Sequence, residues 1–384
     1  MSHPFKHLET QLVHAGEPSP RIAGAVEMPI FQSATYEYAG EGSYDEVRYL
    51  RNNNTPSQLA LHAKLAVLEG AEDALVTASG MAAISGTLLG LLSAGDHVLA
   101  QGGVYGGTHE LLTHEFPRLG LAADTIDADR PESWSQQLKP NTKLIYVEAM
   151  TNPLLEVADL GAVSAFARSH GLLCVIDNTF ATPVNFRPLA HGFDLSIHSA
   201  TKYLNGHADI VAGAVSGTRE LIARIRHKLN VLGGSLDPHA AFLLKRGLKT
   251  LALRVRFQND STLQIAQFLE AHPAVARVNY PGLASHPRHA RASALFSGFG
   301  GVLSFELKGP AARAERFTSR LRIPAVAPSL GGVQTLITRP ASTSHAGVPE
   351  PDRRRLGISD ALLRLSVGIE STEELIADLD QALA

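Results

Sequence analysis

Short apolar runs alternate with longer segments of helical periodicity between about residues 72 and 220. The runs that suit strands are bounded by polar or turn-forming residues and lie at 74–77, 97–100, 144–148, 172–177, 195–198 and 210–216. Strands and helices that alternate in this way predict an α/β fold with a mostly parallel central sheet. In such sheets, ligands bind at the carboxyl ends of the strands.

Two of these segments have a distinctive composition. The run 172–176 is apolar throughout and includes the only cysteine, Cys174, which predicts a strand buried on both faces and a core cysteine. The stretch 74–95 carries no charge and is long enough to span a bilayer. Its serines, threonines and glycines, and its change from strand-like to helix-like composition, favour a buried strand, loop and helix instead.

The pattern changes toward the C-terminus. A long helical stretch covers about 237–271, a strand with partial alternation follows at 300–307, and Ser371 with Glu374 forms a capping box that opens a terminal helix. We therefore predict three parts, which are an irregular N-terminal segment (1–58), a large α/β domain (59–244) and a smaller C-terminal α+β domain (245–384).

Composition excludes several classes of function. The 384 residues include 34 basic and 37 acidic ones, a net charge of −3, which argues against a nucleic-acid binder. Hydrophobic residues make up 45% of the chain, enough for a large core. The N-terminus lacks the apolar segment of a secretion signal, so we expect a cytoplasmic protein. The histidine spacing matches no metal-ligand pattern, so we expect no metal.

The strongest chemical signal lies in the segment 194–207. Lys202 directly follows a strand-like run and has few charged neighbours in the sequence. Partial desolvation would lower the pKa of its amine and make the amine nucleophilic. Ser199 and Thr201 flank it with hydroxyls that suit an anion such as a phosphate. A surface lysine on a turn is the alternative that this segment alone leaves open.

Two other segments complement Lys202. Asp177 ends the most buried strand, where a carboxylate needs a cation or hydrogen-bond donors, and a protonated ring nitrogen would be such a partner. A strand followed by Ser79, Gly80 and a helix start offers backbone N–H groups to a phosphate. No glycine pattern of a dinucleotide or ATP site is present. The combination fits a pyridoxal 5′-phosphate (PLP) enzyme, although Asp177 alone would equally fit a loop cap.

Three motifs resemble the Cys/Met-metabolism (transsulfuration) family of PLP enzymes. They are NTF at 178–180, SATKYLNGH at 199–207 and SLGG at 329–332. This family includes cystathionine γ-synthase, cystathionine β- and γ-lyases, methionine γ-lyase and homoserine-ester sulfhydrylases. The resemblance extends over nearly the whole chain, and the lysine motif is specific for the family rather than for one reaction.

The resemblance implies PLP bound to fold type I in a homotetramer built as a dimer of dimers. It implies that the domain 59–244 binds PLP and that the segment 1–58 is an arm contributing to a neighbouring active site. It implies that Lys202 binds the cofactor covalently and shuttles protons, that Asp177 pairs with the ring nitrogen, and that Tyr105 stacks on the ring. The other residues implied at the cofactor are Gly80, Met81, Ser199 and Thr201 at the phosphate, Asn152 near the phenolic oxygen, and Tyr49 and Arg51 at the phosphate of a neighbouring subunit's cofactor. Those implied at the substrate are Ser329 and Arg364, which bind its carboxylate, and Gln334.

The chain departs from the family pattern in two places, and a third position argues against one member of the family. An extra residue precedes Pro56, which puts the shape of that loop in question. Gln334 stands where many γ-synthases and γ-lyases have Glu, and an amide would favour the distal ammonium of cystathionine less than a carboxylate. Residue 107 is Gly, whereas methionine γ-lyases typically carry Cys, which argues against that member.

The leading functional hypothesis is an enzyme that acts at the β or γ carbon of a small sulfur amino acid, with a preference for a cystathionine lyase. The alternatives are a cystathionine γ-synthase or an O-acyl-homoserine sulfhydrylase, both γ-replacement transferases. A fold-type-I aminotransferase and a PLP-binding regulatory protein represent other classes. The sequence does not rank elimination against replacement, because that choice depends on where protons are delivered. We expect no nucleic-acid or membrane partner.

Overall fold

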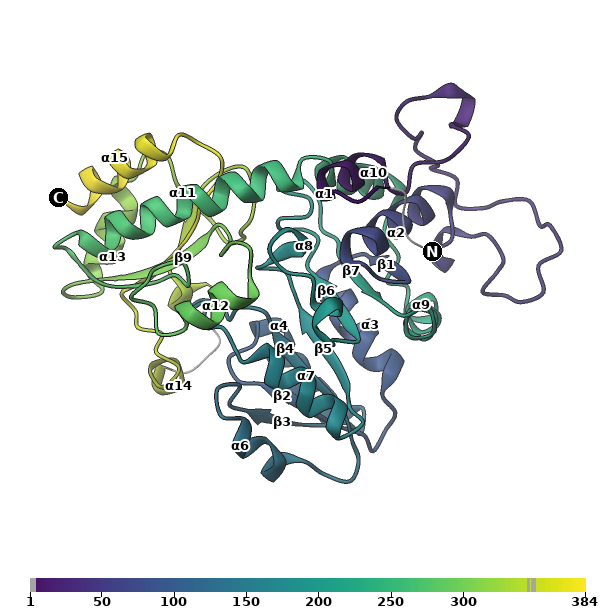
Figure 1. Cartoon of the computed structure of the whole chain (residues 1–384), viewed down its shortest axis with the longest axis horizontal. Coiled ribbons are helices and arrows are strands. Elements are labelled where there is room, and N and C mark those ends of the chain that lie inside the picture. Colours follow the sequence, from purple (N-terminus) through teal and green to yellow (C-terminus); the bar gives the residue numbers. More distant parts are fainter. Residues whose placement is uncertain (1–4, 344–345, 347–349) are drawn as a thin grey trace.

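The structure is a computed structural model that describes residues 5–343, 346 and 350–384. It contains a large unit around a seven-stranded sheet, a small unit around a five-stranded sheet, and an N-terminal arm that projects from the large unit (Figure 1). The helices are α1 Leu8–His14, α2 Pro56–Glu69, α3 Gly80–Leu91, α4 Gly106–Glu110, α5 Phe116–Arg118, α6 Pro131–Trp134, α7 Leu160–Ser169, α8 Thr182–Asn185, α9 Arg219–Leu232, α10 Pro238–Leu248, α11 Leu251–Ala271, α12 His289–Leu295, α13 Ala312–Arg320, α14 Glu350–Arg355 and α15 Thr372–Leu383.

The large sheet has the strand order β1-β7-β6-β5-β4-β2-β3. Only β7 runs antiparallel to its neighbours, so the predicted mostly parallel sheet is confirmed. We did not predict β3, an edge strand whose residues are mostly half-buried or exposed and therefore give no apolar run. The strands are β1 Asp73–Thr77, β2 His97–Gln101, β3 Ala122–Ile126, β4 Thr142–Glu148, β5 Leu173–Asp177, β6 Leu195–His198 and β7 Gly213–Gly217.

The central strands are buried on both faces, as the apolar run around Cys174 predicted. In β4, Leu144 and Tyr146 pack against α3 and α9, whereas Ile145 and Val147 face the core that α2, α7 and α10 cover. Successive side chains of a strand point to opposite faces, so an uninterrupted apolar run is what a sheet between two helical layers requires. Most polar groups of β4 and β5 are thereby left to the strand ends, whereas β6 buries Ser196 and His198, and His198 contacts Ser196 and Glu69.

Two boundary predictions are confirmed. Helix α2 begins at Pro56 behind a capping box at Thr55, and it ends at Gly70, which has a φ of +69°. The uncharged stretch 74–95 forms most of β1, a turn and α3. Across the described part of the chain, no helix has both the length and the apolar character needed to cross a membrane.

The predicted helical stretch 237–271 is two helices rather than one. Helix α10 ends at Leu248 and α11 begins at Leu251. The buried Arg254 of α11 donates from Nη2 to the Gly247 carbonyl (2.9 Å) and from Nη1 to the Tyr203 carbonyl (2.9 Å). This guanidinium therefore joins the helix break to the segment that follows Lys202.

The small unit is built on a sheet with the order β10-β11-β12-β9-β8. Helices α11, α13 and α15 contribute to its apolar core. Ser371 accepts a hydrogen bond from the Glu374 backbone at the start of α15, as the capping box predicted. The strands are β8 Val275–Asn279, β9 Val302–Leu307, β10 Ala325–Val326, β11 Leu336–Thr338 and β12 Leu362–Ser366.

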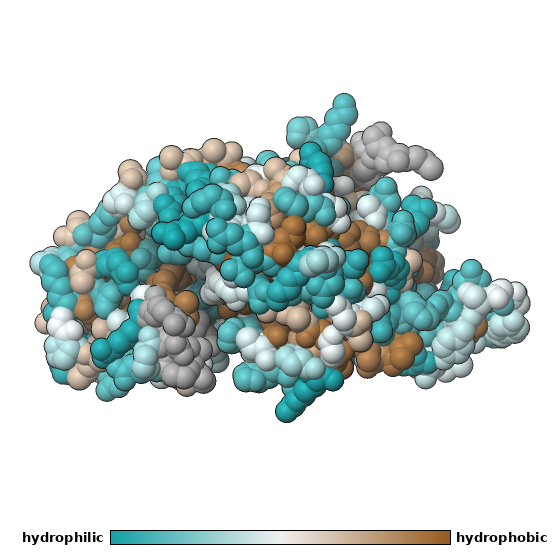
Figure 2. All heavy atoms as spheres, turned by 90° about the horizontal axis from the view of Figure 1, so that it is seen from below, coloured by the Kyte–Doolittle hydropathy of each residue, from teal (hydrophilic) through white to brown (hydrophobic). Residues whose placement is uncertain are grey.

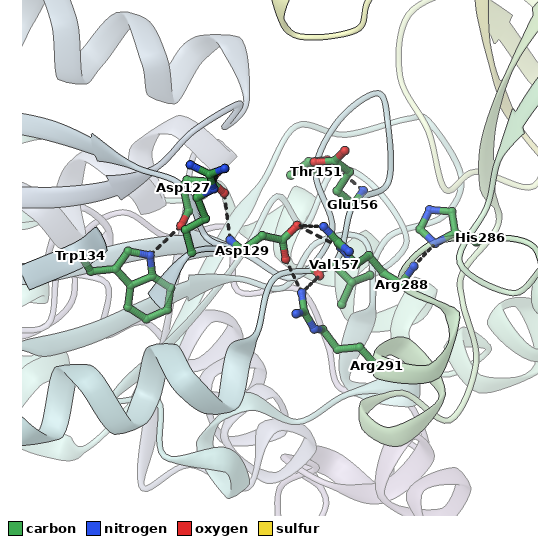
Figure 3. A network of polar contacts seen from close by, with 10 residues as sticks. Asp127, Asp129, Trp134, Thr151, Glu156, Val157, His286, Arg288 and Arg291 are labelled. Carbon is green, nitrogen blue, oxygen red and sulfur yellow. Dashed lines mark hydrogen bonds and ion pairs between the residues drawn. The ribbon is translucent and has the colours of Figure 1, made fainter. Parts of the chain in front are cut away.

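An ion-pair network joins the loop after β3 to the start of α12 (Figure 3). Asp129 accepts from Nε of Arg288 at 3.0 Å and from Nη1 of Arg291, which also donates to the Val157 carbonyl at 2.9 Å. Burial alone would raise the pKa of Asp129, but the hydrogen bonds from both arginines outweigh it and hold the pKa below its ordinary value. One carboxylate thus connects segments about 160 residues apart.

We expect Asp129→Asn to lower the free energy of unfolding at pH 7 by about 1–3 kcal/mol, because two guanidinium groups lose their anionic partner. A carboxylate with a lowered folded-state pKa stabilises the protein above its unfolded pKa. The difference from wild type should therefore shrink as pH falls through about 4. Urea unfolding at several pH values measures this difference. Glu115→Gln, in an exposed pair with Arg118, should cost less than about 1 kcal/mol, and an equal cost of both substitutions would contradict the prediction.

Candidate active site

A cavity of about 720 Å³ lies at the carboxyl ends of β1, β4, β5 and β6. The small unit closes it with residues from the segments 328–330 and 364. Ten of the residues predicted from the sequence line this one cavity, namely Gly80, Met81, Tyr105, Asn152, Asp177, Ser199, Thr201, Lys202, Ser329 and Arg364. Residues from distant parts of the sequence therefore converge where strand-end ligand binding was expected.

Lys202 lies in the turn after β6. Its Nζ donates to Oγ of Ser329 across the cavity, at 2.9 Å. Burial, with a contribution from the positive charge of Arg364, lowers the pKa of Lys202 to about 8. An amine with this pKa is partly neutral near pH 7–8, so it is available as a nucleophile or base.

Asp177 ends β5 on the floor of the cavity. Its Oδ1 accepts from the backbone N–H of Thr179 at 2.9 Å, and the Thr179 hydroxyl accepts from the backbone N–H of Ser199 at 2.8 Å. Burial raises the pKa of the Asp177 carboxyl. A positive partner in the cavity would offset the cost of burying this carboxylate.

The N-terminus of α3 also lines the cavity. Ser79 caps the helix by accepting from the Ala82 backbone at 3.0 Å. A Cβ at position 80 would lie 2.8 Å from Cβ of Ser199, so glycine is needed for these two segments to approach. The Thr201 hydroxyl exchanges hydrogen bonds with the backbone of Ala212, at 3.0 and 3.1 Å.

Arg364 is buried at the boundary between the two units. Its Nη1 donates to Oδ1 of Asn152 at 3.0 Å, and its Nη2 donates to the Ser329 carbonyl at 2.9 Å. Its Nε is buried and has no hydrogen-bond partner. Ser329 has a φ of +113°, a conformation that costs energy for a residue other than glycine and is often found at functional sites.

Three predicted residues lie elsewhere in this chain. Tyr49 and Arg51 do not line the cavity, and Arg51 instead donates to the carbonyl of Asn230 on α9. Gln334 is exposed and also lies outside the cavity lining. The loop with the extra residue before Pro56 is closed locally, because Oδ1 of Asn54 accepts from the Tyr49 backbone at 3.0 Å.

Sequence reasoning missed several cavity residues. Glu148 ends β4 beside Asp177, and both carboxyl groups face the cavity. Glu148 stands at the end of a strand just as Asp177 does, so the same criterion would have identified it. Among the described residues, no group of three or more His, Cys, Asp or Glu side chains is arranged to hold a metal ion.

Comparison with known proteins identifies the family. The model of the Cys/Met metabolism PLP-dependent enzymes matches residues 9–384. The chain belongs to this family. It is therefore a PLP-dependent enzyme, and the predicted family and cofactor are confirmed.

Similar proteins match this chain over nearly its whole length. It is 42% identical to the cystathionine gamma-lyase of Bacillus subtilis and 42% identical to the cystathionine beta-lyase of Lactococcus lactis subsp. cremoris, with 98% of each chain covered. The crystal structure of cystathionine gamma-lyase from Lactobacillus plantarum complexed with L-serine superposes with a TM-score of 0.93 at 38% identity and 98% coverage of both chains. Fold type I is thereby confirmed.

The cavity of this family member fits PLP. The close approach of Gly80 and Ser199 at the N-terminus of α3 forms a cradle with N–H donors for a phosphate. Asp177 offers an anion to a protonated ring nitrogen, and the amine of Lys202 lies within the same cavity. The part that each side chain plays in the reaction stays a prediction.

We expect Arg364→Met to raise the pKa of Lys202, because the substitution removes a positive charge and largely preserves the volume. In the wild-type apoprotein, the rate of PLP capture should rise with pH and level off above about 8, where the amine is neutral. In the variant, the midpoint should move to higher pH. Absorbance of bound PLP in the visible range follows the capture. Arg313→Met, which removes a guanidinium that donates to the Lys308 carbonyl, is the control, and an unchanged midpoint in Arg364→Met would refute this coupling.

Proposed function

We propose that this protein is a carbon–sulfur lyase that acts on cystathionine or a related thioether amino acid. The observation that carries the proposal is the convergence of Lys202 and Arg364 on Ser329, whose hydroxyl accepts from the amine and whose carbonyl accepts from the guanidinium. A carboxylate bound by Arg364 would place the α carbon of an amino acid near the amine of Lys202. The relatives named as cystathionine lyases support the same substrate class.

Each residue then has a defined task. Bound PLP would supply an electron sink that acidifies the α proton of the substrate. Asp177 would hold the proton on the ring nitrogen, and Tyr105 would stack on the ring. Gly80, Met81, Ser199 and Thr201 would hold the phosphate.

Proton transfer would fall to Lys202. Its amine, with a pKa of about 8, would remove the proton from the α carbon and deliver it to a neighbouring atom. Arg364 and Ser329 would fix the substrate carboxylate, since a guanidinium fork binds a carboxylate bidentately. Such fixation keeps the α carbon within reach of the base.

Replacement at the γ carbon is the second candidate. A cystathionine gamma-synthase of Arabidopsis thaliana is 40% identical over 97% of this chain, so the family resemblance alone does not separate the reactions. We favour the lyase because relatives that are 42% identical carry that name, whereas the plant synthase is 40% identical. A fold-type-I aminotransferase would release keto acid only when an amino-group acceptor is present.

Incubation of the PLP-loaded protein with L-cystathionine tests this proposal. We expect equal amounts of keto acid and free thiol, without an added acceptor. Lys202→Ala should lose this activity by at least about 10³-fold, because the proposed base is absent, and it should lose the visible absorbance of covalently bound PLP. Formation of cystathionine from a homoserine ester and cysteine, with no keto acid from cystathionine, would instead establish the synthase.

We further propose that the enzyme is a cytoplasmic homotetramer, in which Tyr49 and Arg51 serve the cavity of a neighbouring subunit. Their position outside the cavity of their own chain supports this assignment. Figure 2 shows hydrophobic surface patches among polar ones. The exposed apolar residues include Val231 at the end of α9 (72%) and Val211 at the cavity (60%). A second copy of the chain would cover such surface.

Complementation between inactive subunits tests the shared site. Lys202→Ala and Arg51→Ala should each be nearly inactive alone. Their co-expression should restore about a quarter of wild-type activity, because half of the randomly mixed dimers then contain one intact site of two. Lys202→Ala with Asp177→Asn is the control, since both residues belong to one subunit's cavity. Equal recovery in both mixtures, or none in the first, would exclude the proposed sharing.

A further inference from the structure

A second carboxyl group lies on the floor of the cavity next to Asp177. Glu148 ends β4, and its Cα is paired with that of Asp177 at the end of β5. The residue is 5% exposed, and it lines the same cavity. Two carboxyl groups at the ends of neighbouring strands are costly to bury, so both need an explanation.

The contacts of Glu148 lead to Tyr105. Oε1 of Glu148 accepts from the backbone N–H of Tyr105 at 2.6 Å, and Oε1 of Gln101 accepts from the backbone N–H of Glu148 at 2.9 Å. Tyr105 is the N-cap residue of α4. The side chain of Glu148 therefore ties the beginning of α4 to the end of β4.

Tyr105 requires such a tether because its side chain has a large free surface. The residue is 44% exposed. One edge of its ring lies against position 107, where a Cβ would come within 2.7 Å of Cε1, and the same Cβ would meet Sδ of Met81 at 2.8 Å. Glycine at 107 leaves room for the ring. The backbone of Tyr105 is held at its N–H by Glu148 and at its carbonyl by the N–H of His109, at 2.9 Å.

The charge of Glu148 follows from its surroundings. Burial and the negative charge of Asp177 raise the pKa of Glu148 well above its ordinary value. Thr179 donates hydrogen bonds to Asp177, and these bonds oppose the effect of burial on the pKa of Asp177. A protonated Glu148 keeps an oxygen that accepts from Tyr105, so loss of its charge does not break the tether.

We propose that Glu148 is a positioning residue for PLP, because its side-chain oxygen holds the backbone N–H of Tyr105 at the start of α4. The inference rests on the proposed stacking of Tyr105 on the cofactor ring. On this proposal, Glu148 contributes through the length of its side chain and its accepting oxygen rather than through its charge.

Substitutions of Glu148 separate the effect of its side-chain length from the effect of its charge. Glu148→Gln keeps the length and the accepting oxygen, whereas Glu148→Asp keeps the acid but is one methylene too short for Tyr105. Glu148→Ala removes both. We expect PLP to bind about tenfold more weakly to the Asp and Ala variants and within twofold of wild type to the Gln variant, by equilibrium dialysis. The visible circular dichroism of bound PLP, which reports ring orientation, should fall by half or more in the same two variants.

A matched control and a double-mutant cycle complete the test. Asp378→Asn alters a buried carboxylate of the small unit that accepts from the backbones of Arg322 and Ile323, and it should leave PLP binding unchanged. In a Tyr105→Ala background, Glu148→Asp should weaken PLP binding by less than twofold, because its effect acts through Tyr105.

Three outcomes would overturn the inference. The first is a Gln variant that binds PLP as weakly as the Asp variant. The second is a full tenfold effect of Glu148→Asp on PLP binding in the Tyr105→Ala background. The third is an Asp variant that binds PLP as tightly as Asp378→Asn. A wild-type protein that binds PLP but cleaves no cystathionine would refute the proposed function and leave the role of Glu148 in PLP binding intact.

Discussion

The burial of the central parallel strands on both faces is the constraint on which the rest of the structure depends. Apolar side chains occupy both faces of β4 and β5, so most polar groups of these strands lie where the strands end. Parallel strands end at the same edge of the sheet, and Glu148, Asp177 and the turn that carries Lys202 therefore lie together. The chemistry of the cavity is a consequence of how its walls are packed.

The small unit completes the cavity and sets its electrostatics. Arg364 on β12 and the strained Ser329 close it from the opposite side, and both are linked to Lys202 by a short chain of hydrogen bonds. Burial and the charge of Arg364 lower the pKa of Lys202 to about 8. The guanidinium of Arg364 therefore has two effects. It suits a substrate carboxylate, and its positive charge favours the neutral amine of Lys202.

The extent to which the sequence predicted this site varied with the kind of signal. Lys202 and Asp177 were found because each charge directly follows an apolar run, which marks a strand end. Glu148 fits the same pattern. Gln334, which the resemblance implies at the substrate, is exposed and lies outside the cavity lining of its own chain. The edge strand β3 and the break between α10 and α11 also escaped prediction, because neither leaves a clear mark in the hydrophobic pattern.

The sequence by itself determined the α/β class, the mostly parallel sheet, the family and the cofactor, because these depend on local periodicity and on motifs of contiguous residues. Only the tertiary structure decided which residues share a cavity, that Tyr49 and Arg51 lie outside their own, and that Glu148 holds Tyr105. The physical reason is that hydrogen bonds and desolvation depend on distances between atoms. Residues 43 or 127 positions apart, such as the pairs Tyr105–Glu148 and Lys202–Ser329, come within 3 Å only when the chain folds.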